Sequence, residues 1–186
     1  MSGISSVNQS AYVGSPTYAR PAAPPKQSSQ VFTIPKIAAP SGSTEVETQR
    51  TPLSGEQAKD ALASAWRNLY HEEASPQTLS VLVAQWSHET GAGRSMMNFN
   101  FGGIKGAGPS GLTTACRTKE GSGETERRIV DHFRAYRSAD EGATDYLRLL
   151  QSRYPQAMEA AKSGDSQGFV HRLKSGGYFT GSEEVY

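Results

Sequence analysis

Cysteine is almost absent from this chain of 186 residues, where Cys116 stands alone. A single cysteine excludes an intramolecular disulfide, and it also excludes a zinc site built on several cysteines. An excess of one charge is missing too, because 19 basic residues face 18 acidic ones and the formal net charge is +1. Without a strongly positive surface, nucleic acid is a poor first choice of partner.

Long apolar runs are also lacking. No stretch approaches the ~18 apolar residues of a membrane-spanning helix, so we expect no membrane span. The first residues, MSGISSVNQSAYVGSP, have neither the basic start nor the apolar centre of a secretory signal peptide. If the protein works outside the cytoplasm, we expect export without a cleavable secretory signal.

Proline is concentrated at one end of the chain. Seven of the ten prolines fall among the first 52 residues, between Ser, Gln, Thr and Ala. This composition buries too little apolar surface to offset the entropy of ordering the chain. We therefore expect a disordered tail over residues 1–52 and one folded domain over residues 53–186. Tyr12, Tyr18 and Phe32 of the tail suit a docking motif, although a solvated leader is the simpler interpretation.

The folded part begins with helical signals. Ser54 and Gln57 have the spacing of a capping box, and apolar residues follow at helical intervals. A second helix is predicted from Pro76 to a stop at Gly91. A third helix follows Ser138, and two short helical stretches complete the chain.

A β-hairpin is predicted between the second and third helices. The stretches LTTACRTKE and RRIVDHFRAY are rich in Thr, Val, Ile and aromatic residues, and they flank the turn sequence GSGETE. The expected class is therefore α+β, a mostly helical domain with one small hairpin lobe.

One carboxylic acid, Glu89, stands close to the end of the second helix. At about 100° per residue it lies at the margin of the apolar stripe that includes Leu82 and Trp86. Desolvation and the helix dipole both disfavour a charged group there, so we predict a raised pKa, which suits a general acid. A surface glutamate is the alternative interpretation. Gly91 and Gly93 favour the acid, because they let a loop and a ligand approach the carboxyl group.

A single acid rarely completes glycosidic cleavage. A second group usually activates water, acts as a nucleophile or stabilises the transition state. The hairpin offers four carboxylates, and composition alone does not rank them against each other or against an ordinary solvated hairpin: Glu120, Glu124, Glu126 and Asp131.

Four blocks occur in a fixed order along the chain: VLVAQWSHETGAGRS, NFNFGGIKG, FRAYRSADEGATDYLRLL and SGGYFTGSEEVY. Together they resemble the glucosaminidase domain of glycoside hydrolase family 73, which occurs in FlgJ-type peptidoglycan hydrolases and in bacterial autolysins. The resemblance covers roughly residues 55–186. It implies a lysozyme-like fold, and it makes residues 53–186 a glucosaminidase-like catalytic domain.

The resemblance also implies roles for single residues. Glu89 matches the catalytic acid of the family, and Glu120, counted back without a gap from Phe133, matches a second carboxylate on the hairpin. Tyr178 matches a tyrosine that faces the cleft and is required for activity. Gly102 stands where the family usually has phenylalanine, so one wall of the cleft should differ. The implied substrate-binding residues, together with aromatic residues suited to stacking on sugars, are Asn100, Phe101, Gly103, Ile104, Lys105, Tyr136 and Tyr186.

The activity that the resemblance implies is hydrolysis of the β-1,4 bond between N-acetylglucosamine and N-acetylmuramic acid in the glycan strand of peptidoglycan. Glu89 would protonate the leaving oxygen. Either Glu120 activates water, or the acetamido group of the substrate attacks while Tyr178 positions it. Neither route needs a metal or a cofactor, and SHETG lacks the second histidine of a His-Glu-x-x-His zinc site.

Other interpretations stay open. A muramidase or a lytic transglycosylase is the rival within enzymology, and a non-catalytic glycan-binding or assembly module is the rival from another class. The implied site of action is the periplasm or cell wall. A secretion apparatus, a flagellar component or an immunity protein are the partners to expect besides the glycan strand.

Overall fold

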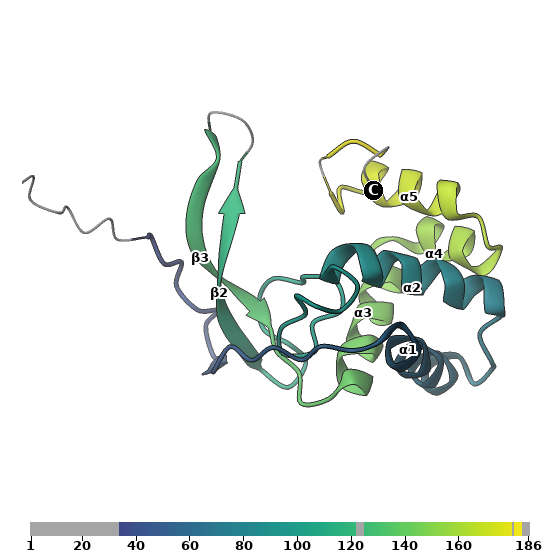
Figure 1. The fold of residues 1–186 in the computed structure, drawn as a ribbon, viewed down its shortest axis with the longest axis horizontal. Helices are drawn as coiled ribbons and strands as arrows, with labels where there is room; N and C mark the ends of the chain where they lie inside the picture. Colours follow the sequence, from purple (N-terminus) through teal and green to yellow (C-terminus); the bar gives the residue numbers. More distant parts are fainter. Residues whose placement is uncertain (1–33, 122–124, 180, 184–186) are drawn as a thin grey trace, which may run out of the picture. The chain divides into compact units, whose positions relative to one another are not determined.

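The computed structural model describes residues 34–121, 125–179 and 181–183. In Figure 1 the elements follow the chain in the order β1 (Thr44–Val46), α1 (Gly55–Tyr70), α2 (Pro76–Thr90), β2 (Leu112–Glu120), β3 (Arg127–Arg134), α3 (Ala139–Arg153), α4 (Pro155–Lys162) and α5 (Ser166–Ser175). The class is α+β, as predicted. Within these ranges no helix is both long and apolar enough to cross a membrane.

The helices begin at the predicted caps. The Ser54 hydroxyl accepts the Gln57 N–H at 3.2 Å, while the Gln57 side chain accepts the Ser54 N–H at 2.8 Å, which completes the capping box of α1. Pro76 opens α2, whose end at Gly91 adopts the left-handed conformation with φ 57°. The Ser138 hydroxyl accepts the Glu141 N–H at the start of α3. Local sequence signals therefore set the ends of the main helices.

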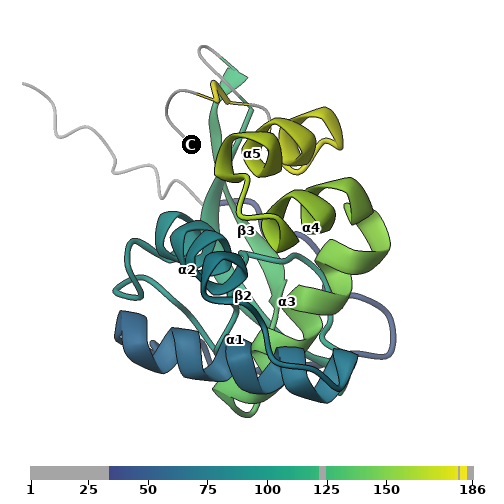
Figure 2. The ribbon, with the colours of Figure 1, turned by 90° about the vertical axis from the view of Figure 1, so that its right-hand side faces the viewer.

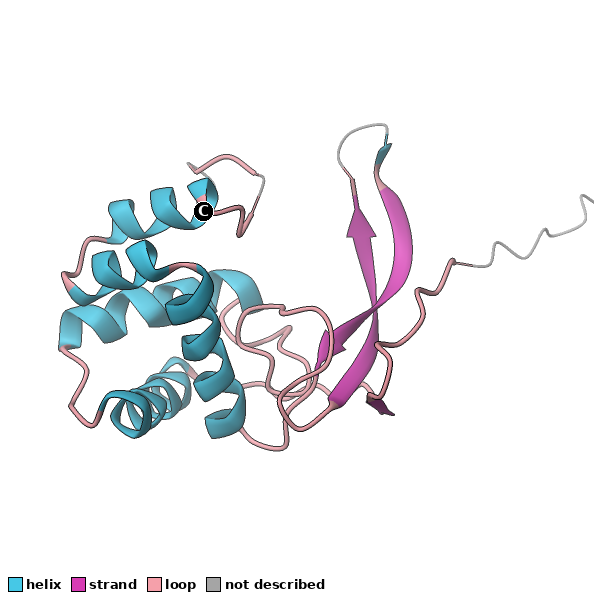
Figure 3. Cartoon of the chain, turned by 180° about the vertical axis from the view of Figure 1, so that it is seen from behind, coloured by secondary structure: helices cyan, strands magenta, loops and turns pink. Residues whose placement is uncertain are grey.

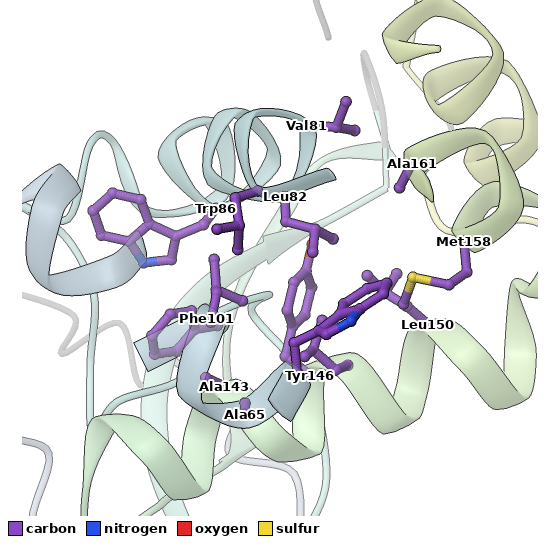
Figure 4. Packing of buried hydrophobic residues seen from close by; sticks show 14 of the residues in the cluster. Ala65, Val81, Leu82, Trp86, Phe101, Ala143, Tyr146, Leu150, Met158 and Ala161 are labelled. Atoms are coloured by element: carbon purple, nitrogen blue, oxygen red, sulfur yellow. The ribbon is translucent and has the colours of Figure 1, made fainter. Parts of the chain in front are cut away.

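The hydrophobic core lies between the helices. Helix α1 packs on α2 and α3, and α4 packs on α2, α3 and α5, an arrangement visible in Figure 2. The rings of Trp86, Phe101 and Tyr146 meet at the centre of this core, with ring centroids 6.2 Å and 6.5 Å apart in succession (Figure 4). Because Trp86 is fully buried, the last turn of α2 is fixed in place, and Glu89 lies on that turn.

The sheet has three strands in the order β1-β2-β3, coloured magenta in Figure 3. Strands β2 and β3 form the predicted hairpin, with antiparallel pairs running from Thr113 and Arg134 to Glu120 and Arg127. Strand β1 lies parallel to β2 at its other edge. Glu120 is thus the last residue of β2.

The prediction of a disordered tail up to residue 52 is wrong for residues 34–52. Strand β1 lies in this range, and the Thr44 N–H donates to the Gly111 carbonyl at 2.9 Å. The segment does not need an apolar core of its own, because its backbone groups pair with the edges of a sheet that other residues form. Residues 1–33, which include the aromatic residues of the expected docking motif, lie outside the described residues.

Candidate active site

The Glu89 side chain is partly buried, one residue before the end of α2. Gln85, one turn earlier and buried, donates from its amide to Glu89 Oε1 at 3.1 Å. The Thr90 hydroxyl donates to the Trp86 carbonyl at 2.6 Å and accepts the Gly93 N–H at 2.9 Å. These bonds close the helix end, so the Glu89 carboxyl group has a defined position.

Of the two glycines that follow Glu89, Gly91 ends the helix as predicted, whereas the task of Gly93 differs from the one predicted. Gly91 supplies the left-handed residue that ends α2. At Gly93 a β-carbon would overlap the Leu53 carbonyl oxygen and lie 2.9 Å from the Trp86 ring, so this glycine makes room for protein rather than for a ligand. The glycine nearest the acid is Gly103, where a β-carbon would lie 3.9 Å from Glu89 Oε2. Space for a ligand therefore comes from the NFNFGGIKG block.

Glu89 lies between two hollows of the surface. One, of about 690 Å³, is bounded by the loop after α2, by residues 115–118 of β2 and by Thr48. The other, of about 460 Å³, is bounded by Tyr178, Tyr154 and several cationic side chains. Glu89 and Gly103 line both hollows. A chain-like ligand lying in both would pass directly over the carboxyl group.

Tyr178 stands in the second hollow with Glu89. Its hydroxyl donates to the Gly102 carbonyl at 3.1 Å, and its ring packs edge-on against Tyr154 with centroids 5.3 Å apart. Burial raises the pKa of the Tyr178 hydroxyl well above its usual range, and the nearby Glu89 charge adds to this effect, while a hydrogen bond with Gln85 opposes it. The hydroxyl therefore stays protonated and can act as a donor.

Gly102 departs from the family pattern for a steric reason. A β-carbon at Gly102 would lie 2.7 Å from the Tyr178 hydroxyl oxygen and 3.0 Å from the Tyr146 ring. The space that a phenylalanine would need is occupied by these two tyrosines. The wall of the cleft at this point is consequently built by Tyr178.

Lys105 links the second hollow to the hairpin. Its ammonium group forms ion pairs with Glu120 and, at 2.7 Å, with Asp131. Burial acts to raise the pKa of Asp131, but the ion pair with Lys105 and the N–H of His132 outweigh it, so this pKa lies below its usual value. The hydrogen bonds to Asp131 and Glu120 hold the pKa of Lys105 above its usual value. Glu120 itself lines neither hollow, and its link to the cleft wall is Lys105.

Two of the implied substrate-binding aromatics belong to the core, which corrects their assignment. Phe101 has no exposed surface, so it cannot stack on a sugar. Tyr136 is 4% exposed, and its hydroxyl donates to Asp145 Oδ2 at 2.7 Å. Burial, followed by the charge of Asp145, raises the pKa of the Tyr136 hydroxyl above its usual range. Both residues support the site from behind.

The NFNFGGIKG loop is shaped by its own asparagine. Asn100 is buried, accepts the Ile104 N–H at 2.9 Å and donates to the carbonyls of Ile104 and Arg134. Gly103, Ile104 and Lys105 then line the second hollow, while Asn100 lines the first. Tyr186 lies outside the described residues.

Several residues of the cleft were not predicted from the sequence. Thr48 and Cys116 line the first hollow, and Tyr154 and Arg134 line the second. Cys116 could have been found, because it lies on the same predicted strand as Glu120, and alternate residues of a strand share one face. Thr48 carried no such signal, since it lies in a segment whose composition resembles a linker.

Fold and cleft together define a class of protein. A helical domain with one small sheet, in which a carboxylic acid at a helix end stands between two hollows, is the arrangement expected of a glycosidase domain. The family model described as glucosaminidase, mannosyl-glycoprotein endo-beta-N-acetylglucosaminidase, matches residues 63–186. The chain belongs to this family of glycoside hydrolases, which confirms the resemblance seen in the four sequence blocks.

Individual relatives agree with this membership. The peptidoglycan hydrolase FlgJ of Vibrio cholerae is 33% identical over 110 residues, which cover 54% of this chain and 32% of that protein. The match thus spans about a third of the relative's length. A crystal structure of a peptidoglycan hydrolase mutant from Sphingomonas sp. A1 is 29% identical with a TM-score of 0.52, covering 71% of this chain and 83% of that one.

A second solved structure shows the same fold. The catalytic domain of the autolysin Auto from Listeria monocytogenes aligns with a TM-score of 0.52 at 23% identity, covering 74% of this chain and 81% of that chain. At this identity the likeness extends to the fold alone.

Proposed function

We propose that this chain is an endo-β-N-acetylglucosaminidase that cleaves the β-1,4 bond between N-acetylglucosamine and N-acetylmuramic acid in the glycan strand of peptidoglycan. Glu89 is the general acid of this proposal. The observation that carries it is the carboxyl group of Glu89 at the boundary of two hollows, both lined by Gly103 as well. The peptidoglycan hydrolases among the relatives support the substrate class.

The chemistry assigned to Glu89 is proton donation. The acid gives its proton to the leaving glycosidic oxygen while positive charge builds at the anomeric carbon of the neighbouring sugar. Gln85 holds one carboxyl oxygen, and the other oxygen, Oε2, faces the glycine of the cleft at Gly103. This orientation supports a role for Oε2 as the atom that carries the proton.

Two routes can complete the reaction, and each has support. Tyr178 lies in the same hollow as Glu89 with its hydroxyl protonated, and a substrate acetamido group that replaced the Gly102 carbonyl as acceptor would be held for attack on the anomeric carbon. Glu120 lies on the hairpin and contacts the cleft wall through Lys105, which suits a base that activates water at a distance. The anomer formed first separates the routes in an NMR time course. The acetamido route retains the configuration, and the water route inverts it.

The deciding experiment compares wild type, Glu89→Gln and a matched control, Glu126→Gln, on purified peptidoglycan. Glu126 is an exposed hairpin carboxylate that pairs with Lys119. Loss of the acid should lower turnover by about 10²–10⁴-fold, with binding to insoluble peptidoglycan retained, while the control cleaves normally. The products of wild type should carry N-acetylglucosamine at their reducing ends.

Other outcomes would overturn this assignment in distinct ways. Turnover of Glu89→Gln at the wild-type rate would remove Glu89 as the acid. Reducing muramic acid would identify a muramidase, and anhydromuramic acid would identify a lytic transglycosylase. Binding without any cleavage by wild type would identify a glycan-binding or assembly module.

We also propose that the enzyme acts in the periplasm or cell wall, where its polymer lies. Its delivery would then involve a secretion apparatus or a flagellar component, and an immunity protein would cover the cleft in a producing cell. Fractionation of cells that express the full chain tests the location, and protein found only in the cytoplasm would contradict it. Crosslinking followed by mass spectrometry identifies which partner class is present.

A further inference from the structure

Residues 35–51, which we call the belt, follow both edges of the hairpin. At the free edge of β3, the Pro35 carbonyl accepts the Val130 N–H at 2.8 Å, and the Ile37 N–H donates to the Val130 carbonyl at 2.8 Å. At the free edge of β2, the belt forms strand β1. Figure 1 shows this segment in purple and blue beside the two strands before it reaches α1. The belt therefore joins β2 and β3 from outside the hairpin.

The second half of the belt holds the loop that follows α2. The Asn98 amide donates to the Glu47 carbonyl at 2.9 Å and accepts the Gln49 N–H at 3.0 Å, and the Phe99 N–H donates to the Thr51 hydroxyl at 2.7 Å. Asn98 and Phe99 have φ values of 45° and 54°. Residues with side chains adopt this left-handed conformation when surrounding contacts hold them in it. The belt supplies such contacts, so it fixes the loop that leads into the cleft.

Thr48 brings the belt into the cleft itself. It lines the hollow of about 690 Å³ together with Glu89, and its hydroxyl is bonded to the Thr114 hydroxyl at 2.8 Å and to the Ala115 carbonyl at 2.9 Å. The family model matches the chain only from residue 63 onward. This wall of the cleft therefore comes from a segment that precedes the matched region.

The lining of this hollow fits an N-acetylated sugar. This lining includes the hydroxyl-bearing residues Thr48, Ser95 and Thr118 and the apolar side chains of Met97 and Phe133. Hydroxyls pair with the polar edge of a sugar ring, while apolar side chains suit its C–H face and the methyl of an acetamido group. The hollow is also lined by Glu89 and is not lined by Tyr178, so it is separate from the hollow that contains the tyrosine.

We propose that the belt forms one wall of a sugar subsite in the hollow that Glu89 lines and Tyr178 does not, and that Thr48 is a specificity-determining residue for glycan strands long enough to reach it. This inference rests on the proposed function. In this proposal the belt has two roles, because it contacts the sugar through Thr48 and positions the loop through Asn98. A glycan fragment that ends before this subsite does not contact the belt, so its binding does not depend on Thr48.

The test uses the full chain with Thr48→Arg and its matched control Gln49→Arg. Both substitutions place the same charge at neighbouring exposed positions, and Gln49 is not among the residues that line the hollow. On long glycan strands, Thr48→Arg should raise KM about tenfold with kcat nearly unchanged. On short fragments that span the scissile bond but end before the wall formed by Thr48, it should behave as wild type. Gln49→Arg should match wild type on both substrates.

Equal effects of the two substitutions, or equal effects of Thr48→Arg on long and short substrates, would overturn the inference. Thermal unfolding of each variant shows whether the fold is kept, and Thr48→Val provides a second variant that keeps the shape of the side chain but loses its hydrogen bonds. It should raise KM by a smaller factor than arginine does.

A binding titration separates failure of the inference from failure of the proposed function. Glu89→Gln and the double variant Glu89→Gln/Thr48→Arg are titrated with long glycan fragments and followed by NMR. Weaker binding of the double variant, by about tenfold, supports the subsite even if the wild type cleaves nothing. Equal binding by the two proteins would contradict the proposed subsite even if the wild type is an active glucosaminidase.

Discussion

Gly93→Ala tests how tightly the end of α2 is packed against Leu53, two residues after the belt. Gly93 has φ +81°, and a β-carbon there would overlap the Leu53 carbonyl oxygen and approach the buried Trp86 ring to 2.9 Å. The left-handed conformation costs a residue with a side chain about 1–2 kcal/mol. Overpacking of a filled site adds about 1–3 kcal/mol. The expected destabilisation is therefore about 2–5 kcal/mol.

Thermal unfolding measured by circular dichroism gives the result directly. For a domain of this size each kcal/mol lowers Tm by about 2–4 °C, so Gly93→Ala should lower Tm by roughly 10 °C. The matched control is Gly111→Ala, because Gly111 has φ +75° with no atom within 4 Å of its β-carbon position. Only the backbone cost applies to the control, and its Tm should fall by less than half as much. Equal Tm values for the two variants would refute the steric reasoning.

Three further experiments, two with variants and one by alkylation, probe the cleft. Gly102→Ala places a β-carbon 2.7 Å from the Tyr178 hydroxyl oxygen, so cleavage should slow by about 10–100-fold in a reducing-end assay, and an unchanged rate would show that the tyrosine tolerates displacement. Lys105→Met removes the partner of Asp131, whose pKa is lowered in the folded protein. Such a carboxylate stabilises the fold above its unfolded pKa of about 3.9, and this stabilisation is lost as the pH falls through the folded pKa. The variant should therefore have a lower Tm at pH 7, and its Tm should fall less than that of wild type as the pH is lowered. A Tm identical to wild type at pH 7 would contradict the ion pair. Burial raises the pKa of the Cys116 thiol, so alkylation at pH 7 should be slow and slower still with bound glycan, while an unaffected rate would place the ligand elsewhere.

Helices were predictable here because their signals are local. The capping box at Ser54, the N-cap at Ser138 and the stop at Gly91 each involve residues within one turn, and the structure confirms them. At Ser138 the Glu141 side chain accepts the Arg137 N–H instead of closing a second box. The belt was not predictable, because its stability comes from pairing with distant strands rather than from its own composition. Thr48 is bonded to Thr114, 66 residues away, and no periodicity along the chain records such a pair.

The site was predictable to the extent that the family pattern names residues. Glu89, Lys105 and Tyr178 were taken from that pattern, and they line one hollow together. Phe101 and Tyr136 were assigned to sugar stacking by residue type alone. An aromatic ring serves a core and a sugar subsite equally well, so its identity does not indicate which one it occupies.

The belt also sets the order in which the cleft can be completed during synthesis. It is made before the strands that it joins, and a contact across such a separation in sequence forms slowly compared with a helical turn. A nascent chain can build α1 and α2 while one side of the groove is still unbuilt. The groove is therefore complete only after the hairpin has emerged, so the belt takes its final place later than helices that follow it in the sequence.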